Sequence, residues 1–169
     1  MEKKYMRAIL VTVLATSCVM SGCGASYPAA VPSKTVANPA VEAQSLKSDL
    51  MSLLERTFAR DDVIIAEADK AKKTFDQARL YKQAYYELFK ATSLVQEEAS
   101  GFSLNPFEAK KRKEIRQETA TTLWKLRYLE KEGGAKANDD EARFALYERL
   151  HKAAYDSLNQ VKRILEQKG

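Results

Sequence analysis

Apolar residues recur every three or four positions through most of the chain from residue 44 onward, which is the period of an amphipathic helix. One such face consists of Ile115, Thr119, Thr122, Leu126 and Leu129. The same spacing occurs before and after it, in Tyr81, Ala84, Tyr85, Leu88, Ala91 and Val95 and in Leu146, Leu150, Ala153, Leu158, Val161 and Leu165. No stretch alternates between apolar and polar residues as a half-buried strand does. The pattern predicts an all-α fold.

Glycine and proline mark two helix boundaries. At the first, Asn105 can cap a helix, Pro106 stands where proline is tolerated, and Glu108 completes a capping box. At the second, Gly133 ends one helix, and Asn138, followed by three acidic residues, begins the next. The acidic residues fit a helix start better than a calcium loop, because the alternating ligand spacing and the glycine of such loops are missing.

The region before these boundaries holds no glycine or proline from residue 45 to residue 99. A single helix of that length would extend about 80 Å at 1.5 Å per residue. Asp61-Asp62, followed by the branched run Val63-Ile64-Ile65, predicts a break, because aspartates cap helices and branched residues weaken them. The sequence leaves open whether residues 44–99 form one helix or two. We expect an antiparallel bundle of three long helices at 62–99, 106–132 and 139–167, with a leading helix at 44–60.

A different composition precedes the helical region. From Gly24 to Ala43 the chain is rich in alanine, serine and valine and carries Pro28, Pro32 and Pro39. Prolines at this density favour extended chain without a core. We expect residues 23–43 to form a flexible tether, and the alternative is a docking strip for a partner.

The first 22 residues have the pattern of an export leader. Lys3, Lys4 and Arg7 precede an uncharged run from Ala8 to Met20. This run is too short to cross a bilayer, which needs about 20 apolar residues. We expect residues 1–22 to be a cleaved signal peptide.

The end of this leader, Met20-Ser21-Gly22-Cys23, resembles the lipobox of bacterial lipoproteins. The resemblance implies cleavage between Gly22 and Cys23 and attachment of a diacylglycerol to the Cys23 sulfur, and many species then acylate the freed amino group. No aspartate follows Cys23, which by the rule of enteric-type lipoproteins implies the outer membrane. The alternatives are lipidation of Cys18 and an ordinary secretory leader.

Composition excludes several other classes. Removing the leader removes Lys3, Lys4, Arg7 and Glu2, which leaves a net charge of +3 and no nucleic-acid-binding balance. The helical region contains no cysteine and a single histidine, His151, so we expect no disulfide, no metal site and no cofactor. His151 lies beside the apolar Leu150 position and is interpreted as a boundary residue.

The densest charge is basic and lies at the start of a predicted helix: Lys110, Lys111, Arg112, Lys113 and Arg116. Cations there oppose the helix macrodipole, so helix stability does not explain them. They could contact anionic headgroups, lipopolysaccharide, peptidoglycan or an acidic partner. A solvated helix face is the simpler interpretation.

Aromatic residues form a second candidate surface. Tyr81, Tyr85 and Tyr86 lie on neighbouring turns of one helix. Core packing is the default for such a group, and an interface with a partner is the alternative. Trp124 flanks the apolar face of its helix, so it is interpreted as a core or half-buried interface residue.

One enzymatic alternative comes from a limited resemblance. Over about a dozen residues, Leu53-Leu54-Glu55-Arg56 through Asp62-Val63 resembles the periplasmic chorismate mutase class. That class clamps a dicarboxylate with basic side chains inside a helical bundle. Candidate side chains here are Arg56, Arg60, Lys70, Arg79, Arg116 and Gln117. The end of the chain, Lys168-Gly169, does not match lipoproteins joined to peptidoglycan, because those end in lysine.

The sequence therefore favours a non-enzymatic, lipid-anchored helical module (residues 44–169) that binds or positions a protein partner in the cell envelope. The host could be a secretion, conjugation or envelope-assembly apparatus. The alternatives are a surface-displayed lipoprotein that acts on a host or neighbouring cell, and the mutase-like enzyme.

Overall fold

The computed structural model describes residues 39–167, with side chains from Leu46 onward. This part of the chain consists of four helices that belong to one compact unit, and it contains no strand. The helices are α1 (Pro39–Lys70), α2 (Thr74–Ala99), α3 (Pro106–Gly134) and α4 (Asp140–Glu166). The expectation of an all-α fold is confirmed. The predicted signal peptide and most of the predicted tether lie outside the described residues.

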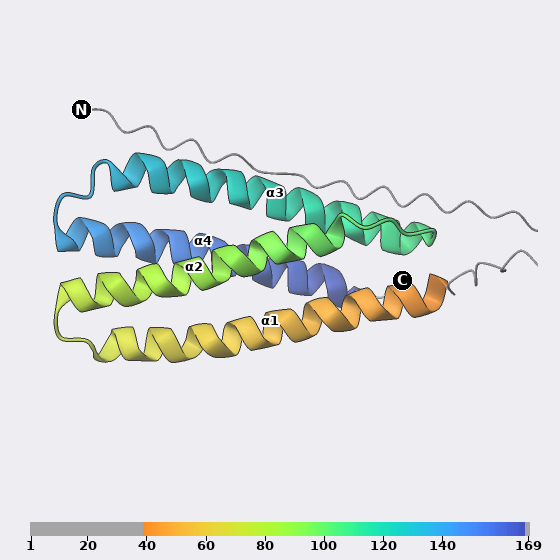
Figure 1. The fold of residues 1–169 in the computed structure, drawn as a ribbon, viewed down its shortest axis with the longest axis horizontal. Helices are drawn as coiled ribbons and strands as arrows, with labels where there is room; N and C mark the ends of the chain where they lie inside the picture. The colour runs from red at the N-terminus through yellow and green to blue at the C-terminus, as the bar shows by residue number, and fades with distance from the viewer. Residues whose placement is uncertain (1–38, 168–169) are drawn as a thin grey trace, which may run out of the picture. The chain divides into compact units, whose positions relative to one another are not determined.

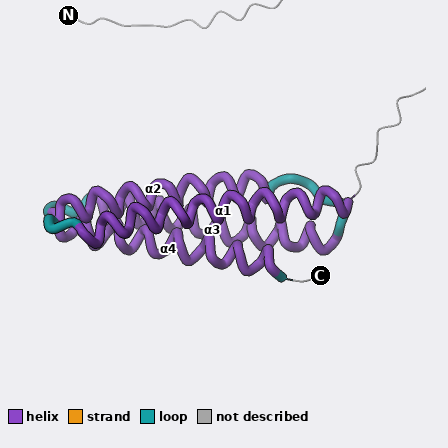
Figure 2. Tube along the Cα trace, turned by 90° about the horizontal axis from the view of Figure 1, so that it is seen from below, coloured by secondary structure: helices purple, strands orange, loops and turns teal. Residues whose placement is uncertain are grey.

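Successive helices run in opposite directions, joined by short loops at the two ends of the unit (Figure 1). α2 and α4 pack against each other along the middle, while α1 packs mainly on α2 and α3 packs on both α4 and α2. Figure 2, turned by 90°, shows that the four helices lie along one common axis and that the loops lie at their ends. The two ends therefore differ in content. One holds the start of α1 and the α2–α3 loop, and the other holds the α1–α2 and α3–α4 loops.

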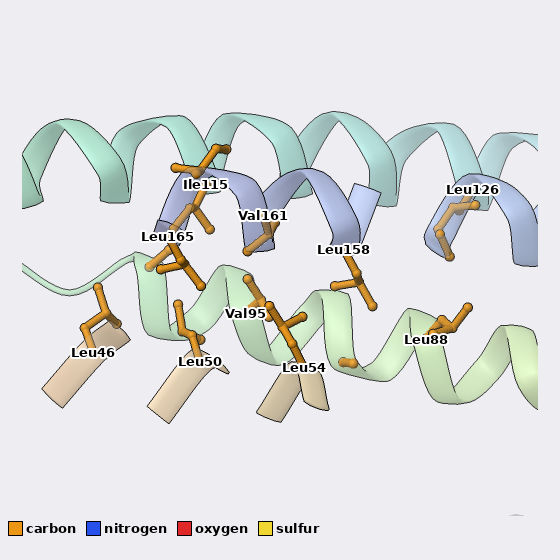
Figure 3. Packing of buried hydrophobic residues seen from close by; sticks show 14 of the residues in the cluster. Leu46, Leu50, Leu54, Leu88, Val95, Ile115, Leu126, Leu158, Val161 and Leu165 are labelled. Atoms are coloured by element: carbon orange, nitrogen blue, oxygen red, sulfur yellow. The ribbon is translucent and has the colours of Figure 1, made fainter. Parts of the chain in front are cut away.

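The core is built from the apolar faces that the period predicts. Figure 3 shows its side chains pointing into the space between the helices, among them Leu50 of α1, Leu88 and Val95 of α2, Ile115 of α3 and Leu158 of α4. Each of these five is at most 1% exposed. Burying one such side chain contributes about 1.5–3 kcal/mol, so these faces hold the helices together. A smaller cluster, Ile64, Ala68, Leu80 and Ala84, joins the end of α1 to the start of α2.

Two predicted boundaries are confirmed in place but differ in detail. Asn105 caps α3, and its side-chain oxygen accepts hydrogen bonds from the backbone N–H of Phe107 at 3.0 Å and of Glu108 at 3.4 Å. α4 is capped by Asp139 and not by Asn138, since the Asp139 carboxylate accepts from the Ala142 N–H at 2.7 Å. The register of this cap therefore lies one residue beyond the prediction.

The predicted break at Asp61-Asp62 is wrong. α1 is one helix of 32 residues that begins at Pro39, within the range expected for the tether, and continues through Asp61 to Lys70. The chain turns at residues 71–73, where neither glycine nor proline stands. The turn is held by the Ala71 N–H, which donates to the Ala68 carbonyl at 3.1 Å, and by the Gln77 side chain, which donates to the Ala71 carbonyl at 3.1 Å.

Candidate functional site

The basic segment at the start of α3 divides into inner and outer side chains. Lys111 turns inward, and its Nζ donates to the carbonyl oxygens of Leu165 at 3.2 Å and Gln167 at 2.6 Å. It thereby satisfies carbonyls at the end of α4, which have no partner within their own helix. Burial, followed by the nearby charge of Lys47, lowers the pKa of the Lys111 ammonium from its ordinary value. Lys111 therefore joins α3 to α4.

Arg112 also has an internal role. Its Nε and Nη2 each lie 2.8 Å from one carboxylate oxygen of Glu108, and its Nη1 donates to the Glu98 carbonyl at 2.8 Å. Glu108 is buried, and its other carboxylate oxygen has no hydrogen-bond partner among the residues that the structure describes. Glu108 therefore pairs with Arg112 and does not complete the predicted capping box. The pair fixes the end of α2 to the start of α3.

The other three cations of the segment face solvent. Lys110, Lys113 and Arg116 are exposed, and Lys110 lies 4.0 Å from Glu114 on the next turn. An exposed pair of this kind contributes at most about 0.5 kcal/mol. The five basic residues therefore do not act together, and only these three are available to an outside partner.

The three tyrosines of α2 also separate. Tyr85 is fully buried, so the core interpretation holds for it, whereas Tyr86 is exposed and Tyr81 is half-buried. The hydroxyls of Tyr85 and Tyr86 donate to the two carboxylate oxygens of Glu130 on α3, at 3.0 Å and 2.5 Å. The hydrogen bond to Glu130, together with burial, raises the pKa of Tyr86 to about 12. Burial first, and then the same carboxylate, raises the pKa of Tyr85 above its ordinary value.

A pair of exposed aromatic side chains lies on the outer face of α3. Trp124 is 69% exposed and Tyr128, one turn later, is 53% exposed. Their rings stack nearly parallel, with centroids 5.7 Å apart and an angle of 8° between the planes. Trp124 is therefore not a core residue, which was one of the two interpretations of its sequence position. We call Trp124 and Tyr128 the aromatic pair.

The surroundings of the aromatic pair are mainly basic, although the exposed acid Glu132 lies one turn after Tyr128. Lys125, Arg127 and Lys131 are exposed on the same stretch of α3, and Arg127 lies 5.7 Å from the centre of the Phe89 ring on α2. Tryptophan, tyrosine and arginine are the residues most often found at the energetic centres of protein interfaces. A flat aromatic surface flanked by cations can pack against apolar side chains of a partner while its rim pairs with carboxylates.

The sequence contained a signal for this surface that was overlooked. Beyond its first turn, the buried positions of α3 are Ile115, Thr119, Thr122, Leu123 and Leu126. Trp124 and Tyr128 are four residues apart and lie outside that set, so helical geometry places them together on the opposite side. Two aromatic residues that share the polar side of an amphipathic helix are unexpected for a solvated face.

A buried polar pair was also missed. Asp61 of α1 is only 2% exposed, and its two carboxylate oxygens lie 2.9 Å and 3.0 Å from Nε2 of His151 on α4. The rings of Tyr81 and Tyr155 lie against the imidazole, with centroids 5.6 Å and 6.0 Å away. Because an ionised carboxylate only accepts hydrogen bonds, Nε2 is the donor when Asp61 is ionised.

This Asp61–His151 pair opens on a shallow depression of about 300 Å³, lined also by Asp62 and Asp69. Among the described residues, the lining of the depression contains no serine, threonine or cysteine beside the histidine. Within residues 39–167, no three histidine, cysteine or acidic side chains are grouped as metal ligands. The pair is therefore best explained as a structural link between α1 and α4.

The residues considered for a mutase-like site do not converge. A dicarboxylate clamp needs its cations inside one cavity, where water is excluded. The six candidates are instead all exposed and are spread over three helices: Arg56, Arg60, Lys70, Arg79, Arg116 and Gln117. Arg60 pairs with Glu87 at 3.1 Å on the surface. This arrangement gives no support to the enzymatic alternative.

The chain was compared as a whole with membrane spans and with known proteins. Of α1 to α4, none has the length and the hydrophobicity that a membrane span needs. Comparisons of this chain with models of protein families, with curated proteins and with solved structures found no match. Because no match was found, only the residues of this chain bear on its function.

Proposed function

We propose that this chain is a lipid-anchored module of the bacterial cell envelope that binds a protein partner through the outer face of α3. The observation that carries the proposal is the aromatic pair, Trp124 and Tyr128, which is stacked, exposed and flanked by Arg127. Exposing two large rings to water has no benefit for the fold, because their burial would stabilise it. Partner binding gives them a role. In this proposal the four helices act as one antiparallel bundle that presents α3.

The anchor in this proposal is the lipid on Cys23, with an outer-membrane location favoured. Two or three acyl chains hold a protein at a membrane almost permanently, since each buried CH₂ contributes about 0.8 kcal/mol. Pro39, where α1 begins, is sixteen positions after Cys23 in the sequence. Sixteen residues span at most about 55 Å when fully extended, so the helical module works within that distance of the lipid surface. In this proposal the partner belongs to a secretion, conjugation or envelope-assembly apparatus.

Site-specific photocrosslinking in the native bacterium tests the partner surface. A photoreactive phenylalanine derivative at Thr121, one turn before Trp124, should yield a discrete crosslinked protein in intact cells. The combined substitution Trp124→Ala and Tyr128→Ala should remove that product. The same derivative at Glu55, an exposed position of α1, is the control. Equal crosslinking from both positions, or crosslinking that the double substitution leaves unchanged, would contradict the proposed surface.

Fatty-acid labelling tests the anchor separately. We predict that Cys23→Ala gives an unlipidated or uncleaved protein that is no longer retained in the membrane fraction, while a fragment of residues 44–169 stays folded and soluble. Metabolic labelling followed by fractionation measures both. Continued labelling of the Cys23→Ala variant would move the anchor elsewhere, and Cys18→Ala would then show whether Cys18 carries it.

A further inference from the structure

The loop between α2 and α3 carries apolar side chains that the fold does not bury. Phe102 is 84% exposed and Leu104 is 67% exposed, and Phe107 on the first turn of α3 is also exposed. We call these three residues the apolar tip. They lie within six residues of one another at one end of the molecule, whereas single exposed apolar residues are usually scattered.

The α2–α3 loop is held in a defined conformation by hydrogen bonds. The Asn105 N–H donates to the Ser103 hydroxyl at 3.2 Å, and Ser103 is buried. Arg112 reaches the Glu98 carbonyl just before the loop, and a Cβ at Gly101 would lie 2.8 Å from its guanidinium. Because the backbone is fixed at both sides, Phe102 and Leu104 are directed away from the core. A surface that binds them has little ordering entropy to overcome.

The apolar tip lies at the same end of the molecule as the start of α1 (Figure 1). The chain that carries Cys23 therefore joins the helices at this end. If Cys23 is lipidated, the end of the molecule at which the anchored chain enters α1 is also the end that exposes the apolar tip.

The charges around the apolar tip are mixed, with cations on the α3 side. Lys110 and Lys113 are exposed on the first turns of α3, and Lys47 is exposed on α1. The exposed acids at this end are Asp49 on α1, Glu97 and Glu98 at the end of α2 and Glu166 at the end of α4. Phe102, Leu104 and the cations of α3 form the combination found on proteins that lie at anionic bilayers, where rings enter the interface and lysines meet headgroups.

We propose that the apolar tip inserts into the interfacial region of an anionic phospholipid bilayer and seats this end of the four helices on the membrane. This contact is separate from the lipid anchor, and it rests on the proposed function only for its location in the envelope. It also orients the molecule. Trp124 lies eighteen residues after Pro106 along α3, which places the aromatic pair about 27 Å from the tip-bearing end of the helix.

Vesicle flotation with the mature chain tests the proposal without the anchor. Residues 23–169 carrying Cys23→Ser are mixed with vesicles of equimolar phosphatidylethanolamine and phosphatidylglycerol, or of phosphatidylcholine alone. We expect binding to the anionic vesicles and weaker binding to the neutral ones. The double substitution Phe102→Asp and Leu104→Asp should weaken binding at least about tenfold, because each apolar contact is replaced by a charge of the wrong sign. Lys110→Glu with Lys113→Glu should weaken it several-fold.

The matched control is Phe75→Asp, which makes the same change at an exposed phenylalanine at the other end of the molecule. It should leave vesicle binding unchanged. Equal thermal unfolding curves for all variants would show that the helices stay folded. Unchanged flotation of the Phe102→Asp/Leu104→Asp variant overturns the proposal. Absence of vesicle binding by the parent chain also overturns the proposal. A dimer of the parent chain that this substitution disrupts overturns it as well, because the apolar tip would then bind a second copy of the chain. Because the chain tested lacks lipid, these results are independent of the outcome of Cys23 labelling.

Discussion

Two pairs of side chains in this molecule lie where their chemistry is least expected. Asp61 and His151 are polar and form a hydrogen-bonded pair between α1 and α4, in which the aspartate is buried. Trp124 and Tyr128 are aromatic and are stacked on the outer face of α3. A buried polar group and an exposed apolar surface are the informative exceptions to the rule that hydrophobic residues lie inside.

The two exceptions have different explanations. The Asp61–His151 pair is formed within the fold, because both carboxylate oxygens of Asp61 lie within 3.0 Å of Nε2 and two tyrosine rings lie against the imidazole. The aromatic pair has no such complement among the residues that the structure describes, since its two rings contact each other and remain exposed. We therefore interpret the first pair as a contribution to stability, and the second as the surface that the proposed partner binds.

The sharpest test of this distinction is His151→Ala. The substitution leaves the Asp61 carboxylate buried without its hydrogen-bond donor, and breaking a buried pair in this way costs about 3 kcal/mol. The free energy of unfolding, measured by urea denaturation, should fall by that amount. Replacing both partners, with Asp61→Leu and His151→Leu, should recover part of the loss because no charge is then left unpaired. A loss below about 0.5 kcal/mol for His151→Ala would show that the pair is not a structural link.

The misplaced break at Asp61 shows where sequence patterns were insufficient. Paired aspartates before a branched run favour a helix start, and locally that inference is sound. Packing overrides it here, since Asp61 is bound by a histidine ninety residues away and Ile64 joins the cluster with Leu80. The true turn at residues 71–73 has no glycine or proline, and Lys73 at the start of α2 makes no side-chain cap, so the strongest local signals are missing there.

The outer surface was predictable only in part. The period of α3 correctly gave its buried face, including Ile115 and Leu126, because burial repeats with the helix. The five-residue basic segment was correctly located as charged, but its division could not be foreseen. Lys111 and Arg112 donate hydrogen bonds to carbonyls at the ends of α4 and α2, which lie against the first turns of α3. This contact is a property of the tertiary fold and leaves no trace in the local sequence.

Arg112→Met is expected to have the second-largest effect. It removes the guanidinium that pairs with buried Glu108, whose second oxygen already has no partner in the described part of the chain. The loss should be about 2 kcal/mol, less than the full cost of breaking a buried pair because the N-terminus of α3 itself favours a negative charge. Lys113→Met, at an exposed position one residue later, is the matched control and should change the stability by less than about 0.5 kcal/mol. If Arg112→Met lowered the free energy of unfolding as little as Lys113→Met does, the buried Arg112–Glu108 pair would not stabilise the fold.

Glu130→Gln examines a case between the two pairs, a carboxylate that joins buried Tyr85 to exposed Tyr86. Because the hydrogen bond to Glu130 is the largest cause that raises the pKa of Tyr86 to about 12, the substitution should return that pKa toward 10.0. Alkaline titration followed by near-ultraviolet absorbance measures this change.

The hydrogen bond between Tyr86 and Glu130 also makes the stability of the fold fall at high pH. A folded-state pKa above the unfolded value means that the stabilisation is fully present below about pH 10 and is lost as the pH rises through about 12. The Glu130→Gln variant should therefore lose less stability than the parent over that range. At neutral pH it should cost about 1 kcal/mol, the usual value of one hydrogen bond. An unchanged tyrosine titration would show that the Glu130 contact does not form in solution.

The smallest effect on stability is expected for Trp124→Ala combined with Tyr128→Ala, and this absence of an effect completes the comparison. Both rings are exposed, so their removal leaves no cavity and should change the free energy of unfolding by less than about 0.5 kcal/mol. Calorimetry or urea denaturation measures this directly. A loss above about 2 kcal/mol would mean that the rings stabilise the fold, and the reason for assigning them to a partner would disappear. A stable variant that no longer crosslinks from Thr121 would instead separate the two roles, because the surface would then be needed for binding and not for folding.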